Sequence, residues 1–109
     1  MATFVLVQTE ESPAHWPELV ADLTDRGDTC LLADLTTAPA DQHADRVAWA
    51  ATRSRTSPYL VVHGEHGPLL DEVLRRFHFA AVVYLGEEPV EEAVRLLGRA
   101  VRMQKAGHP

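Results

Sequence analysis

Four short apolar runs, separated by segments with helical periodicity, constrain the fold of this chain more than any other feature. The runs cover residues 3–8, 29–35, 59–62 and 79–85, and none alternates strictly between apolar and polar residues. Strands that are apolar on both faces are typical of parallel sheets covered on both sides by crossover helices. The sequence therefore predicts a three-layer α/β fold, with a parallel four-stranded sheet and helices on both faces.

The segments between the runs carry the signals of amphipathic helices. Apolar residues recur at spacings of three and four, as at Trp16, Leu19 and Leu23 in the first segment. Pro68 and Pro89 suit the first position of the third and fourth helices, because a helix leaves that N–H without a partner anyway. Strand and helix thus alternate from one end of the sequence to the other, with right-handed crossovers between the strands.

Length and composition favour one ordinary globular domain. The chain has 109 residues, 46% hydrophobic and 24% charged, so we expect a single domain over residues 3–105 and a flexible tail over 106–109. The net charge of -6 argues against a nucleic-acid or anionic-membrane partner, since both need a basic surface. No apolar run approaches the roughly 18 residues of a membrane span. A lone cysteine, Cys30, and a start without signal-peptide features predict a cytoplasmic protein.

Several segments resemble the N-terminal half of the α/β-hydrolase superfamily. They are the first strand at 3–7, the segment WPELVADL at 16–23, Arg26-Gly27 and the run LLADL at 31–35. The resemblance extends over about residues 3 to 90 and implies the strand order 2-1-3-4, an order that flavodoxin-like folds share. It also implies that the turn from His63 to Gly67 takes the place of the nucleophile elbow.

A sheet of this order has a switch point between its first and third strands, and ligands bind in the crevice that forms there. Two segments would form the walls of that crevice, the loop after the first strand and the turn after the third. The predicted ligand-binding residues are Gln8, Thr9, Glu10, Gly64 and Gly67.

The turn departs from the hydrolase pattern, which places a nucleophile at the centre of Gly-x-Ser-x-Gly. Here the central residue is Glu65, or His66 in the shifted frame, and neither frame presents serine, cysteine or aspartate. The acid and the final histidine of a triad are also missing from their expected places. We therefore expect a degenerate elbow and a pseudoenzyme without triad hydrolysis.

Glu65, His66 and His63 are nevertheless the candidate catalytic residues. A carboxylate near a helix N-terminus is stabilised by free N–H groups, and a neighbouring histidine would supply acid–base chemistry. The alternative is that Glu65 caps the helix and that both histidines are ordinary loop residues. The spacing His-Gly-Glu-His matches no zinc pattern, so we expect neither a metal nor a cofactor.

Two functions remain open. The favoured one is a small-molecule-binding or assembly module, which forms a homodimer through an edge strand such as the apolar run at 80–83. The alternative is a small enzyme, either a divergent esterase or thioesterase or an acid–base catalyst on a carbonyl substrate, that uses Glu65 and His66. Either function would take a small acyl or carbonyl ligand.

Overall fold

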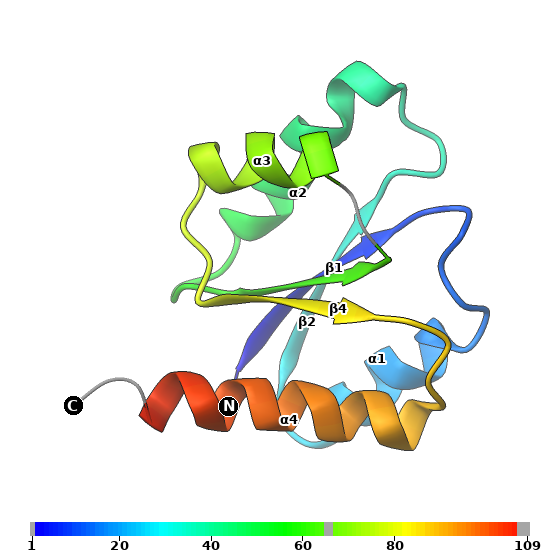
Figure 1. Ribbon diagram of the computed structural model, residues 1–109, viewed down its shortest axis with the longest axis vertical. Coiled ribbons are helices and arrows are strands. Elements are labelled where there is room, and N and C mark those ends of the chain that lie inside the picture. The colour runs from blue at the N-terminus through cyan, green and yellow to red at the C-terminus, as the bar shows by residue number, and fades with distance from the viewer. Residues whose placement is uncertain (1, 65–66, 107–109) are drawn as a thin grey trace.

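The computed structural model describes residues 2–64 and 67–106 of the chain (Figure 1). In that part, four parallel strands form one sheet in the order β2-β1-β3-β4, which confirms the predicted fold class and strand order. The strands are β1 (Thr3–Gln8), β2 (Thr29–Asp34), β3 (Tyr59–His63) and β4 (Ala81–Leu85). The helices are α1 (Trp16–Asp25), α2 (His43–Ala51), α3 (Gly67–Arg76) and α4 (Val90–Ala106), with a short 3-10 helix at Ala40–Gln42.

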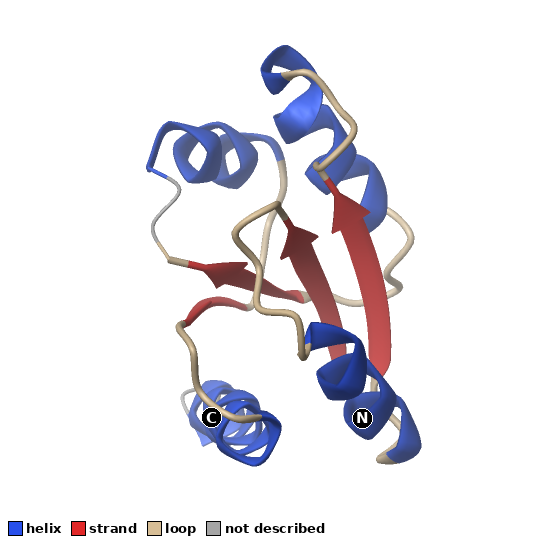
Figure 2. Cartoon of the chain, turned by 90° about the vertical axis from the view of Figure 1, so that its right-hand side faces the viewer, coloured by secondary structure: helices blue, strands red, loops and turns tan. Residues whose placement is uncertain are grey.

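The helices form two layers, one on each face of the sheet. Helices α1 and α4 cover one face, and α2 and α3 cover the other (Figures 1 and 2). Strand β1 shows why both layers are needed. Phe4 and Leu6 contact the α1/α4 layer, whereas Val5 and Val7 contact the α2/α3 layer, and each is at most 1% exposed. Burying one such side chain stabilises the fold by about 1.5–3 kcal/mol, so each layer stabilises the central strands substantially.

The observed boundaries differ from the predicted ones by one or two residues. Strand β2 ends before Leu35, and β4 begins after Phe79 and Ala80. Leu35 and Ala80 each join the neighbouring strand or its flank through one backbone hydrogen bond only. The N–H of Leu35 donates to the Gln8 carbonyl at 2.9 Å, and the N–H of Ala80 donates to the Pro58 carbonyl at 2.8 Å. Helix α4 continues to Ala106, which the sequence assigned to the tail, and residues 107–109 lie outside the described part.

The connections create a topological switch point between β1 and β3. Strand β1 is followed by α1 on one face, and β3 is followed by α3 on the opposite face. The chain therefore leaves the carboxyl ends of these neighbouring strands in opposite directions, which is the arrangement that opens a crevice in α/β sheets. The described members of the predicted site, Gln8, Thr9, Glu10, His63, Gly64 and Gly67, lie at this end of the sheet.

Within residues 2–64 and 67–106, no helix combines the length and the apolar character that crossing a membrane requires.

Candidate functional site

His63 is the last residue of β3, and its ring lies on the α1/α4 side of the sheet. The edge of the ring meets the Trp16 indole, with the centroids 6.4 Å apart and the planes at 87°. Its Nε2 lies 3.2 Å from Oε1 of Glu87, in the loop after β4. Its Nδ1 is buried and has no hydrogen-bond partner among the described residues.

These contacts leave His63 poorly placed for acid–base catalysis. A catalytic imidazole needs one nitrogen within hydrogen-bond reach of the substrate, while the other is oriented by a partner. In His63, Nε2 already contacts Glu87, and Nδ1 is enclosed by protein. The side chain is only 16% exposed, so the ring acts as part of the packing around Trp16.

The turn after β3 begins at Gly64, which has a φ of +70°. This left-handed conformation strains any residue with a side chain, so glycine is required there. The Gly64 N–H donates to the Leu85 carbonyl at 3.1 Å and ties the turn to β4. Gly67 begins α3, and a Cβ added to it would meet no described atom within 4 Å. No close approach of other atoms therefore requires a glycine at position 67.

Glu65 and His66, the central residues of the predicted elbow, lie outside the described residues. Their catalytic role, and with it the enzymatic alternative, stays a prediction from the sequence.

The loop after β1 is closed by its own hydrogen bonds. The Thr9 N–H donates to Ser12 Oγ at 2.9 Å, and the Glu11 N–H donates to Thr9 Oγ1 at 3.3 Å. The Gln8 side-chain amide donates to the Thr9 carbonyl at 3.4 Å. An anion hole in this loop would need free backbone N–H groups, and that of Thr9 is already occupied. Gln8 and Thr9 therefore stabilise the loop instead of offering such a hole.

A hollow of about 440 Å³ lies at the carboxyl end of the sheet, on its α2/α3 side. It is formed by the loops after β1 and β2 and by the first turn of α3. The described lining residues are Thr9, Glu10, Glu11, Leu35, Thr36, Ala38, His43 and Leu69. The structure thus brings Thr9 and Glu10 together as predicted ligand-binding residues. Gln8, His63, Gly64 and Gly67 are not in this lining, and His63 lies on the other face of the sheet.

Thr36 and His43 belong to this hollow, although the sequence did not single them out. Nε2 of His43 donates to the Ala38 carbonyl at 2.9 Å, which leaves Nδ1 as an acceptor in the neutral ring. The Thr36 hydroxyl donates to Asp34 at 2.6 Å, and together with the Thr36 N–H it lowers the pKa of that carboxyl group. Thr36 could have been found as a residue just after β2. His43 could not have been found from the sequence, because its position depends on the path of the loop between Thr36 and His43.

The hollow combines acceptors with an apolar wall. Glu10 and Glu11 contribute carboxylates, and Leu35 and Leu69 contribute aliphatic side chains. Carboxylates hold ammonium and hydroxyl donors well and repel anions. A ligand with a donating head and a short apolar body therefore fits this lining better than a carboxylate or an acyl anion. No group of three potential ligands that could hold a metal ion occurs among the described residues.

Comparison with known proteins found no match to a protein-family model, to a curated protein or to a solved structure. The resemblance to the α/β-hydrolases therefore stays a prediction, and the structure supports the sheet order independently of it.

Proposed function

We propose that the chain is a small-molecule-binding module whose ligand enters the hollow at the carboxyl end of the sheet. The observation that carries this proposal is the hollow itself, which opens between the loops after β1 and β2 and the first turn of α3. Ligands of open α/β sheets bind in this place because adjacent loops diverge there. Catalysis is not part of the proposal, since the turn lacks a hydroxyl or thiol nucleophile and His63 is engaged in packing.

The ligand that we propose is a small amine with a short aliphatic body, in place of the acyl or carbonyl compound suggested by the resemblance. Glu10 and Glu11 would hold the ammonium group, and Leu69 would contact the aliphatic part. An acyl anion would face two carboxylates, and the N–H of Thr9 that would balance its charge already donates to Ser12. Charge-assisted hydrogen bonds to a carboxylate are about twice as strong as neutral ones, which favours the amine.

The test is an NMR titration of the ¹⁵N-labelled full chain with butylamine, butanol and butyrate, three probes that differ only in the head group. We expect butylamine to shift the amides of Thr9, Thr36 and Leu69 in a saturable manner, with butanol weaker and butyrate without effect. Glu10→Gln should weaken butylamine binding by roughly fivefold to tenfold, because the amide oxygen still accepts a hydrogen bond while the charge assistance, about 1–1.4 kcal/mol, is lost. Glu18→Gln, an exposed change on α1, is the control. Equal affinity of the two variants, or no shift at these amides, would remove the proposal.

We also propose a homodimer, with the β2 edge as its interface. The run at 80–83, favoured by the sequence, is partly covered in the structure. At the β2 edge, in contrast, Leu32 is 54% exposed and Trp49 is 64% exposed. These two residues line a groove of about 670 Å³ together with Asp34, Asp45 and Arg46.

A second copy is the partner that this groove suits. An isologous contact places the same patch on both sides, so the patch must complement itself. The β2 groove carries acidic and basic side chains around its apolar centre, so Arg46 of each copy can meet Asp34 or Asp45 of the other. Edge-to-edge pairing would also satisfy the open backbone groups of β2.

Light scattering during gel filtration tests the dimer. We expect a dimer at high micromolar concentration and a monomer for Leu32→Lys, because a charge in the centre of the interface cannot be paired by symmetry. Leu74→Lys is the matched control, since Leu74 is 46% exposed on α3, away from β2. A monomeric parent chain, or dissociation by both variants alike, would contradict the β2 interface.

A further inference from the structure

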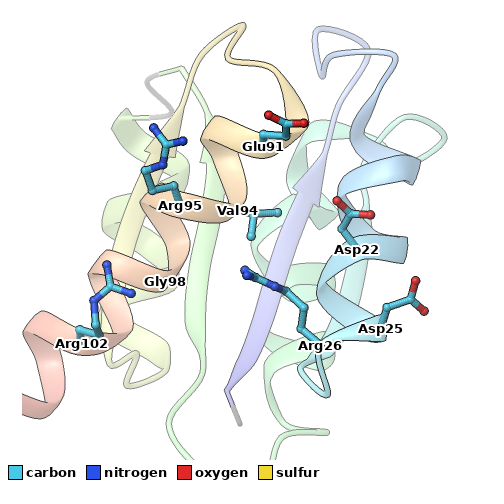
Figure 3. Close-up of a pocket in the computed structure, with 8 residues that line it drawn as sticks. All are labelled: Asp22, Asp25, Arg26, Glu91, Val94, Arg95, Gly98 and Arg102. Carbon is cyan, nitrogen blue, oxygen red and sulfur yellow. The ribbon is translucent and has the colours of Figure 1, made fainter.

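A second groove lies between α1 and α4, on the opposite face of the sheet from the carboxyl-end hollow (Figure 3). It has a volume of about 520 Å³ and runs between the second half of α1 and the middle of α4. Its lining residues are Asp22, Asp25, Arg26, Glu91, Val94, Arg95, Gly98 and Arg102. Three of these lining residues are arginines.

Two of these arginines have open hydrogen-bond donors. Arg95 contacts Glu92 at 3.1 Å, but Arg26 and Arg102 have no ion pair or hydrogen bond from their side chains to any described residue. Figure 3 shows the Arg26 side chain reaching from α1 toward α4, below Val94. The acidic residues of the groove therefore do not neutralise these two guanidinium groups by direct contact.

A smaller hollow of about 130 Å³ adjoins the groove, and its mainly apolar lining also includes Asp28. The two share Arg26, Val94 and Gly98, and the walls of the smaller hollow include Phe4 and Leu23. An apolar cavity of about 150 Å³ in another protein holds a benzene molecule. The smaller hollow is thus close to the size that accepts one six-membered ring.

Gly98 lines both hollows and so marks the passage where they adjoin. A Cβ added to it would meet only the Arg102 guanidinium, with Nη1 at 3.4 Å, among the described atoms. The absence of a side chain at this position lets Arg102 lie over the helix. A glycine inside a helix costs about 0.5–1 kcal/mol relative to alanine, so the opening has a cost in stability.

We propose that this groove binds a small organic anion, with a carboxylate or phosphate group held by Arg26 and Arg102 and an apolar body of about one ring inserted beside Gly98. Guanidinium groups present paired donors that match the oxygens of both anions. Three arginines and three carboxylates leave the groove without net formal charge. Binding must therefore come from direct contact together with burial of the ring, so a simple ion should bind weakly.

The experiment is an NMR titration of the full chain with four probes: benzoate, phenyl phosphate, benzyl alcohol and inorganic phosphate. We expect benzoate or phenyl phosphate to shift the amides of Arg26, Val94 and Gly98, with at least tenfold weaker binding of benzyl alcohol and of inorganic phosphate. The tighter of the first two probes identifies the anionic group. If neither shifts these amides, or if inorganic phosphate binds as tightly as both, the proposal is overturned.

Two variants and a control distinguish this site from a nonspecific surface effect. Arg26→Gln should weaken binding at least tenfold, and Gly98→Leu should abolish it by filling the passage. Arg75→Gln, an exposed arginine on α3, should leave the affinity unchanged. A helical circular dichroism spectrum and a melting curve verify that each variant is folded. Equal affinity for Arg26→Gln and Arg75→Gln would contradict the site, whatever the result at the carboxyl-end hollow.

Discussion

The two tryptophans show how differently the two faces of the sheet are built. Trp16 on α1 is 1% exposed and meets the His63 ring, whereas Trp49 on α2 is 64% exposed, with the Arg53 guanidinium 5.2 Å from its ring centroid. The α1/α4 layer fills its space with large side chains. The buried residues of α2 are small, namely Val47, Ala50 and Ala51. Helix α1 is therefore held to the sheet by large buried side chains, and α2 by close approach to the sheet.

Replacing each tryptophan with alanine should give the largest difference between the faces. Trp16→Ala removes a fully buried ring and should cost about 3–5 kcal/mol of unfolding free energy. Trp49→Ala loses only an exposed cation–π contact and should cost about 1 kcal/mol or less. Urea unfolding followed by circular dichroism measures both.

If Trp16→Ala does not fold, the two tryptophans can be compared by acrylamide quenching instead of urea unfolding. The single-tryptophan variants Trp16→Phe and Trp49→Phe then report on one tryptophan each. At a concentration where the chain is monomeric, Trp49 should be quenched readily and Trp16 should be protected. Similar quenching of the two would mean that the faces do not differ in this way.

Part of this contrast could be predicted from the sequence. The apolar runs at 3–8, 29–35, 59–62 and 79–85 predicted a sheet covered on both faces, whereas the order of its strands was expected only from the resemblance. The stripe of Ala44, Val47, Ala48 and Ala51 on α2 can likewise be read from the sequence, and its small residues permit close approach to the sheet. Periodicity places Trp16 on the apolar stripe of α1 with Leu19 and Leu23, but it did not show that Trp49 is exposed.

The site was harder to predict than the fold for a physical reason. Its residues come from loops, whose paths depend on local hydrogen bonds such as the one from Thr9 to Ser12. Glu87 pairs with His63 only because β4 lies beside β3, and no sequence pattern marks the loop after β4 as part of a site. His43 enters the hollow because its ring donates to Ala38. The strand order could be expected from the resemblance and from the alternation of strands and helices, whereas these pairings require the positions of individual atoms.

Replacing a buried alanine of α2 with a larger residue tests how closely α2 approaches the sheet. Ala51 is fully buried, so Ala51→Leu should cost about 1–3 kcal/mol through overpacking. Ala21→Leu, on the exposed side of α1, should change the stability by less than about 0.5 kcal/mol. Urea unfolding of the two variants gives the comparison. A neutral Ala51→Leu would show that α2 has space beneath it.

Cys30 on β2 reports on the α1/α4 face, against which it packs. Burial raises the pKa of its thiol to about 11, with a smaller increase from Asp28 and an opposing hydrogen bond with Thr24. Because the folded pKa lies above the unfolded value of 9.0, the thiol's contribution to stability is complete below pH 9 and is lost as the pH rises toward 11.

Alkylation measures this environment directly. At pH 8 the thiolate fraction of the folded chain should be about 100-fold lower than that of the unfolded chain, and the greater nucleophilicity of a high-pKa thiolate should offset about tenfold of this. Iodoacetamide should therefore modify the folded chain roughly tenfold more slowly than the chain in urea. Equal rates would show that β2 leaves the thiol open to solvent.

The contact between His63 and Glu87 should have the smallest effect, although it lies beside the buried Trp16. Glu87 is 77% exposed, so water and salt screen its charge, and exposed ion pairs contribute about 0–1 kcal/mol. A double-mutant cycle with His63→Gln and Glu87→Gln should give a coupling energy below about 1 kcal/mol that decreases at high salt. A larger, salt-independent coupling would mean that the α1/α4 face is stabilised by this pair as well as by its large buried side chains. The single variant His63→Gln should still destabilise the chain more than Glu87→Gln, because only the ring of His63 packs against Trp16.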